Sequence, residues 1–176
     1  YVRAWAGFTY VSFIVDVFAQ KIIAWNAATS KDVNLVMTPL RTAIWQRQRE
    51  GHPIELHERI GHPDAGSHHT SITFTDHLDL EGFRPSIGTV ADAYDNAIMG
   101  TVTGLFKSKY IRTTVFYTGP CRTIAKVKWA TTRWVDWWNN WRPHSSLAYQ
   151  APEEFEQAHY AALNRGLQPA HDSRKT

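Results

Sequence analysis

The stretch GFTYVSFIVDVFAQKIIAW, Gly7 to Trp25, decides the fold class. Its first part, Gly7 to Val17, is a nearly continuous run of β-branched and aromatic residues, which is typical of a strand buried on both faces. Lys21 to Trp25 repeats this character after a short turn at Ala19–Gln20. Together with YVRAW at residues 1–5, the stretch predicts three strands in a meander.

A helix is expected to follow over residues 31–49, because Ser30 can cap its first turn. Its apolar residues recur at helical spacing and predict one buried face, formed by Val33, Val36, Leu40, Ile44 and Trp45. Gly51–His52–Pro53 is expected to end it.

The remaining elements alternate between strands and helices. We expect strands at residues 54–60 and 83–90, with a loop at Gly61–Ser67 and a helix at Thr70–Leu80 between them. A helix opening at Asp95–Asn96 and a long helix over Ile124–Trp141 complete the set. This order predicts an α/β domain with a mixed sheet, a meander first and crossover strands after it. The core should span residues 1–160, and residues 161–176 should form a polar, flexible tail.

Composition narrows the function classes without choosing one. The chain has 176 residues and a formal net charge of +3, and Cys121 is its single cysteine, which excludes an internal disulfide and suits a reducing compartment. No apolar run approaches the roughly 20 residues that span a bilayer.

The distribution of charge along the sequence is uneven. Residues 51–100 carry eight acidic and two basic side chains, whereas residues 101–150 carry one acidic and eight basic ones. This contrast fits a metal-dependent enzyme acting on a polyanion, and equally two solvated faces.

Four tryptophans lie at helical spacing in the long helix: Trp134, Trp137, Trp138 and Trp141. Such a stripe is typical of a core or a subunit interface, and a base-stacking platform is the alternative.

The segment HPDAGSHHTS, residues 62–71, carries the candidate acid. Asp64 follows a predicted strand, at the sheet edge where α/β sites form, or it only caps the loop. A nearby histidine cluster (His57, His62, His68 and His69) suggests zinc, but its spacing matches no standard ligand pattern. The chain also has no G-x-S-x-G motif of a serine hydrolase.

A further stretch, YDNAIMGTVTGLFKSKY at residues 94–110, raises a different question. Ile98, Val102, Phe106 and Tyr110 predict a helix with one buried face, but Gly100 and Gly104 lie on another face. A glycine inside a helix costs about 1 kcal/mol relative to alanine. The glycines therefore need a reason that helix propensity does not supply.

The segments GFTYVSFIVDVFAQKIIAW, HPDAGSHHTS, GTVADAYDNA and RPHSSLAY resemble the transposases of bacterial insertion sequences, of the second-reading-frame type with a retroviral-integrase-like core. The resemblance covers residues 1 to about 160. It implies a ribonuclease-H-like fold with a mixed five-stranded sheet, and an Asp-Asp-Glu catalytic triad. The family reaction is DNA end cleavage and strand transfer in DNA integration.

The resemblance also assigns positions in the site. Asp64 matches the second acid and is the expected metal ligand. The third acid should follow with thirty-five residues between, which places Gly100 at its position. The first acid would precede Tyr1, in a first strand that the sequence cuts short. The chain is therefore expected to lack strand-transfer activity, or to be a non-catalytic DNA-binding or oligomerising remnant.

Cofactor and partners follow from the same resemblance. The family uses Mg²⁺ or Mn²⁺, which one aspartate should hold poorly. The expected partners are transposon ends and target DNA. Asn96, Thr103 and Lys107 are the expected DNA-binding residues. The chain is also expected to form a homo-oligomer. The expected location is the bacterial cytoplasm, at the nucleoid. Asp16 is expected to be mainly structural, and the roles of Arg142 and His144 stay open between a site and a structural turn.

Overall fold

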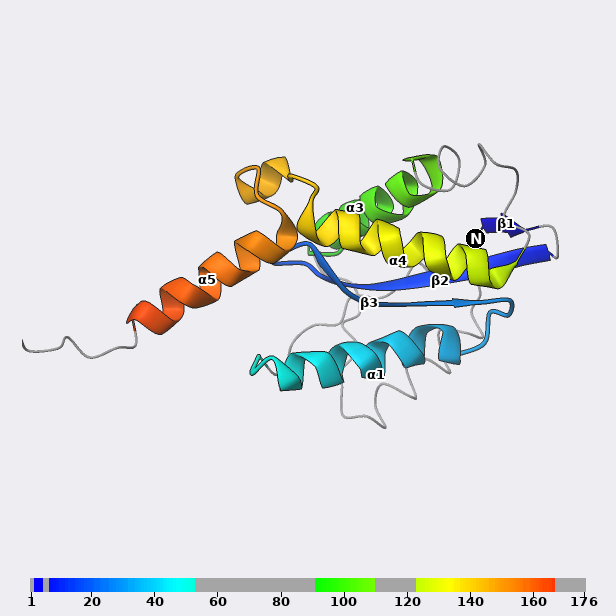
Figure 1. Ribbon diagram of the computed structural model, residues 1–176, viewed down its shortest axis with the longest axis horizontal. Helices are drawn as coiled ribbons and strands as arrows, with labels where there is room; N and C mark the ends of the chain where they lie inside the picture. The colour runs from blue at the N-terminus through cyan, green and yellow to red at the C-terminus, as the bar shows by residue number, and fades with distance from the viewer. Residues whose placement is uncertain (1, 5–6, 53–90, 110–122, 167–176) are drawn as a thin grey trace, which may run out of the picture.

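The computed structural model describes residues 2–4, 7–52, 91–109 and 123–166, and they form a mixed α/β fold (Figure 1). The strands predicted at 54–60 and 83–90, and the loop and helix predicted between them, lie outside the described residues.

A three-stranded antiparallel meander lies at the centre. Strands β1 (Val2–Ala4), β2 (Gly7–Asp16) and β3 (Lys21–Ala28) are neighbours in that order, with Phe13 opposite Trp25. The meander predicted from the sequence is confirmed, and β3 runs three residues beyond its predicted end. The turn between β2 and β3 places Gln20 at a φ of +53°.

The sheet is covered on both faces, which explains the continuous apolar run of β2. Helix α1 (Asn34–Arg49) lies on one side, and helices α3 (Ala91–Leu105) and α4 (Ile124–Asn140) lie on the other (Figure 1). Because successive strand residues point to opposite faces, Ile14 packs with the α1 core and Phe13 with the α3–α4 core.

Helix α1 begins later than its sequence predicts. The N-cap position belongs to Val33, and no side chain caps it. Ser30 instead donates a hydrogen bond to the carboxylate of Asp32, 2.6 Å away, and Asp32 accepts one from the amide of Asn34 at 2.9 Å. The prediction of Ser30 as cap is therefore wrong, because its hydroxyl is bound to Asp32 and the helix starts four residues later, at Asn34. Trp45, expected on the buried face, is 56% exposed. The predicted stop is correct, since Gly51 follows with a φ of +77°.

Helix α3 also departs from the expected start. It begins at Ala91, so Asp95 and Asn96 lie inside the helix and do not cap it. Its apolar face is confirmed by the burial of Ile98, Val102 and Phe106. Residues 106–109 continue it as a π-helical turn.

The tryptophans of the predicted stripe on helix α4 differ in burial. Trp134 and Trp138 are buried in the core, where Trp138 Nε1 donates to the carbonyl of Gln20 at 2.8 Å. Trp141, just beyond the helix, is 72% exposed, so the expectation of a common core face holds only for part of the stripe.

The last helix, α5 (Pro152–Gly166), was not predicted. A short 3₁₀ turn, η3 (Ser145–Leu147), leads into it, and Figure 1 shows α5 extending away from the other helices. It includes residues 161–166 of the segment expected to be a flexible tail, so that boundary is wrong. The sequence held the signal, because Pro152 at the first helical position followed by Glu153 and Glu154 is a typical helix start.

Truncating the tryptophan side chain to alanine should affect stability differently at the two ends of the stripe. We expect Trp134→Ala to lower the free energy of unfolding by about 3–5 kcal/mol, because it removes a fully buried indole that contacts Phe13 and Phe106. Trp141→Ala, on the exposed end, should change it by less than about 1 kcal/mol. Urea unfolding of both variants measures the difference, and equal losses would contradict the packing described here.

Candidate functional site

Of the two predicted catalytic positions, the structure describes position 100 but not position 64. Asp64 lies outside the described residues, so its prediction as the second acid is not tested. Gly100 lies in α3 and is exposed, on the side of the helix away from the buried Ile98 and Val102. The position expected for the third acid therefore faces solvent and carries no side chain.

Neither glycine of α3 is required by sterics. A Cβ atom built on Gly100 or Gly104 meets nothing within 4 Å, and neither residue has a positive φ. Both positions therefore have room for a side chain in an ordinary helix. The structure supplies no packing reason for the glycines.

The residues predicted to bind DNA are distributed along α3. The side chain of Asn96 is not described. The Thr103 hydroxyl donates within the helix to the carbonyl of Met99, 2.8 Å away. Lys107 is exposed in the π-helical turn, next to the buried Phe106. A role in DNA binding stays a prediction for all three.

Asp16 is held by its own surroundings. Its Oδ2 forms an ion pair with Arg47 Nη2 at 2.6 Å, and its Oδ1 accepts hydrogen bonds from the amides of Phe18 and Ala19 at 2.8 and 3.3 Å. Both oxygens thus stabilise the turn after β2 and its contact with α1. This arrangement agrees with the mainly structural role expected from the sequence.

The described side chains do not fit a pair of divalent cations. Within residues 2–4, 7–52, 91–109 and 123–166, no three His, Cys, Asp or Glu side chains converge as metal ligands. Mg²⁺ requires oxygen donors in near-octahedral array, and Gly100 offers none from a side chain.

Among the described residues, a set of buried ion pairs lies where β3, α1 and α5 meet. Lys21 Nζ pairs with Glu153 at 2.7 Å and with Glu156 at 2.6 Å. Arg47 pairs with the other oxygen of Glu156 at 2.5 Å and with Glu50 at 3.2 Å. Lys21, Arg47 and Glu156 are all buried. Sequence reasoning missed this network, because burial of a lysine and an arginine leaves no periodic signal.

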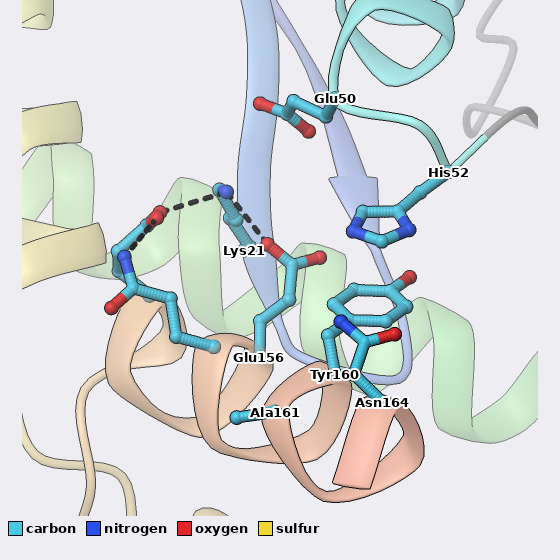
Figure 2. A pocket seen from close by; sticks show the side chains of 9 residues that line it. Lys21, Glu50, His52, Glu156, Tyr160, Ala161 and Asn164 are labelled. Atoms are coloured by element: carbon cyan, nitrogen blue, oxygen red, sulfur yellow. Dashed lines mark hydrogen bonds and ion pairs between the residues drawn. The ribbon is translucent and has the colours of Figure 1, made fainter. Parts of the chain in front are cut away.

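A pocket of about 400 Å³ opens beside this network (Figure 2). Lys21 and Glu156 form part of its wall, and the ring of His52 stacks on Tyr160 with 3.4 Å between ring centroids. The buried cations are already paired with carboxylates, so this region can join α5 to the sheet and to α1.

The pKa directions agree with a stable ionic contact. Burial by itself would raise the pKa of Glu156, but Arg47 and Lys21 outweigh burial and hold that pKa below its ordinary value. Burial would lower the pKa of Lys21, and its carboxylate partners outweigh it, so the net pKa is raised. Breaking such a buried pair by removing one partner generally costs about 3–5 kcal/mol.

The segment RPHSSLAY forms a compact corner between α4 and α5. The guanidinium carbon of Arg142 lies 4.4 Å from the ring centroid of Trp138, and the buried His144 approaches the same ring edge-on. Nδ1 of His144 lies 3.1 Å from the side-chain oxygen of Gln20. Of the two roles left open for Arg142 and His144, the geometry favours the structural turn.

His144 should make stability depend on pH. Burial, followed by the charge of Arg142, lowers the pKa of His144 from 6.5 to about 4. The unfolded chain therefore binds a proton more readily, and stability should fall as pH decreases from 6.5 toward 4. We expect His144→Gln to reduce this fall by on the order of 2 kcal/mol between pH 6.5 and pH 4.5. Urea unfolding across that range measures it, with the exposed His159→Gln as control, and parallel curves for wild type and His144→Gln would contradict it.

The sequence was compared with protein families, with known proteins and with solved structures. The family model described as "Integrase core domain" matches residues 81–152. The assigned transposase for insertion sequence element IS986/IS6110 of Mycobacterium tuberculosis is 41% identical over 165 residues, which cover 94% of this chain and 58% of that protein. The transposase for insertion sequence element IS629 of Shigella sonnei is 37% identical, over 93% of this chain and 51% of its own length. No solved structure matches the chain significantly.

The chain spans a little over half the length of these relatives. None of the described helices is both long and apolar enough to cross a membrane. The resemblance seen in the sequence is confirmed: the chain is similar to transposases of insertion sequences, and residues 81–152 match an integrase core domain.

Proposed function

We propose that this chain is the core of a DNA transposase that has lost its metal-dependent chemistry. In the family, that chemistry cleaves transposon ends and joins them to target DNA. The observation that carries the proposal is the setting of Gly100, which is exposed on α3 in open space and lacks a side chain. The position is available to a catalytic acid, and no acid is there.

The loss matters because the reaction needs two cations. Such sites hold their metals about 3.5–4 Å apart, one at the attacking and one at the leaving oxygen. With a glycine at position 100, no second carboxylate stands there to share the cations with Asp64, and Mg²⁺ wants six oxygen ligands. Asp16 does not replace the missing acid on this proposal, because its two oxygens are bound to Arg47 and the turn amides. We infer that the chain does not retain the Mg²⁺ or Mn²⁺ pair of its family.

We further propose that the fold is ribonuclease-H-like, with five strands. The described meander would supply three of them, and the predicted strands at 54–60 and 83–90 would supply the crossover strands. This topology would bring Asp64, after the first crossover strand, to the sheet edge beside the Gly100 face of α3. On this proposal the chain acts as a homo-oligomer on transposon and target DNA in the bacterial cytoplasm, at the nucleoid.

Restoring the acids should restore the reaction. The test extends the chain at its N-terminus with the segment that carries the family's first acid, and adds Gly100→Glu. We expect Mn²⁺-dependent cleavage of transposon-end DNA only when both changes are present, because only then do three carboxylates converge. Gel electrophoresis of labelled DNA ends measures cleavage, and calorimetric titration measures Mn²⁺ binding.

Gly104→Glu is the matched control. It adds the same charge to the same helix one turn later, at a position that is equally exposed and equally open. Both substitutions also remove a helical glycine, so neither should destabilise α3. Cleavage by the unrepaired chain, or equal activity of the two glutamate variants, would contradict the proposal.

A second candidate function is a non-catalytic DNA-binding or oligomerising remnant. It is favoured by the exposed cations of the π-helical turn after α3 and of α4, namely Lys107, Lys109, Lys126, Lys128 and Arg133. Asp136 is the only acid on the described part of residues 97–140. Neutralising phosphates with such side chains gives affinity that does not depend on metal.

Salt dependence tests the remnant function. We expect the chain to bind duplex DNA with a log–log salt slope of several charges, and Lys107→Gln to reduce the magnitude of that slope by about 1. Arg165→Gln, an exposed cation near the end of α5, is the control and should leave the slope unchanged. Gel-shift titration at several salt concentrations measures the slope, and no binding at low salt would reject the remnant function.

A further inference from the structure

One large aromatic side chain of α4 points away from the core. Trp129 is 60% exposed, whereas Trp134 and Trp138 of the same helix are buried. The guanidinium carbon of Arg133, one turn later, lies 5.0 Å from the centroid of the Trp129 ring. One face of the indole is therefore held under a cation, and its exposure must come mainly from the other face and the ring edges.

The surroundings of Trp129 are basic and polar. Lys126, one turn earlier, and Lys128 are exposed on the same helix, with Thr132 and Asp136 as further exposed neighbours. Residues three and four apart share a helix face, so Lys126, Trp129 and Arg133 form one row. We call these three residues the α4 row.

The lysines beside Trp129 count against a protein interface. The exposed residues around Trp129 on α4 include Lys126 and Lys128 but no valine, leucine or isoleucine, and lysine is depleted at protein interfaces. A two-fold contact through this face would place the cations of one copy against those of the other. Positive charge on both sides of an aromatic ring instead complements a strand of phosphates that carries bases.

We propose that the α4 row binds single-stranded DNA. Trp129 stacks on an unpaired base, while Lys126 and Arg133 contact the phosphates on either side. The strand must be single, because a ring that protrudes from a helix can stack only on a base whose face is not covered by its neighbours. The inference rests on the proposed action on DNA and adds a contact for an unpaired end, on a helix other than α3.

The sequence directed attention to other tryptophans. The stripe from Trp134 to Trp141 was the candidate for base stacking, but its central members are in the core. Trp129 lies off that stripe, so it is exposed.

Helix α1 offers a matched control with the same chemistry. Trp45 is 56% exposed, and the guanidinium carbon of Arg49 lies 4.7 Å from its ring centroid, again four residues later. This pair lies on the helix that covers the other face of the sheet (Figure 1) and lines a shallow hollow with Glu50, whose carboxylate disfavours phosphate.

The experiment measures fluorescence anisotropy of a labelled single-stranded oligonucleotide and its duplex with Trp129→Ala, Trp129→Phe and Trp45→Ala. We expect Trp129→Ala to weaken single-strand binding about tenfold, because stacking on an aromatic ring contributes that order of affinity. Duplex binding should change less than threefold. Trp129→Phe should stay within about threefold of wild type, and Trp45→Ala within twofold. Thermal unfolding should show all variants folded.

Each result bears on the inference. Single-strand binding by Trp129→Ala within twofold of wild type would overturn it, as would an equal loss with Trp45→Ala. A change in sedimentation with unchanged DNA affinity would assign Trp129 to a subunit contact and also overturn it. If wild type binds duplex DNA but the Trp129 variants do not differ, only this inference fails. If wild type binds no DNA at low salt, the DNA-binding function fails with it.

Discussion

The contact of Phe106 with Phe13 and Trp134 fixes which face of α3 reaches solvent. The three rings belong to α3, β2 and α4, with centroids 5.1 to 5.4 Å apart for each pair. Such aromatic pairs contribute about 0.5–1.5 kcal/mol each beyond the area that they bury. Because this contact locks one side of α3, Gly100 lies on the outer side. The scaffold of the site therefore persists independently of whether the site carries an acid.

A second constraint holds the C-terminal part of the chain. Glu156 contributes its two oxygens to Lys21 and Arg47, which come from β3 and α1. Buried charges are costly unless each has a partner, so these three side chains depend on one another. The aromatic contact uses the buried Phe106, whereas Gly100 is exposed. The proposed loss of chemistry at position 100 is thus compatible with a well-packed core.

The sequence predicted features that repeat or that have strong local rules. The apolar run of β2 and the burial of Ile98 and Val102 follow from periodicity, and both appear in the structure. The start of α4 at Ile124 was predicted, but the start of α1 was not, because the carboxylate of Asp32 engages Ser30 and the amide of Asn34, and α1 starts at Asn34. The open space around Gly100 depends on how helices pack on the sheet, which periodicity does not contain. The prediction that position 100 lacks a catalytic acid came from the family resemblance and not from the residue pattern alone.

The most direct measurement is a crystal structure of the unmodified chain grown in manganese. We infer that Asp64 cannot anchor two divalent cations when a glycine stands at position 100. We therefore expect no pair of well-occupied manganese ions at Asp64 and Gly100, and at most one weak site. Two fully occupied ions about 4 Å apart, with every protein ligand supplied by this chain, would contradict it.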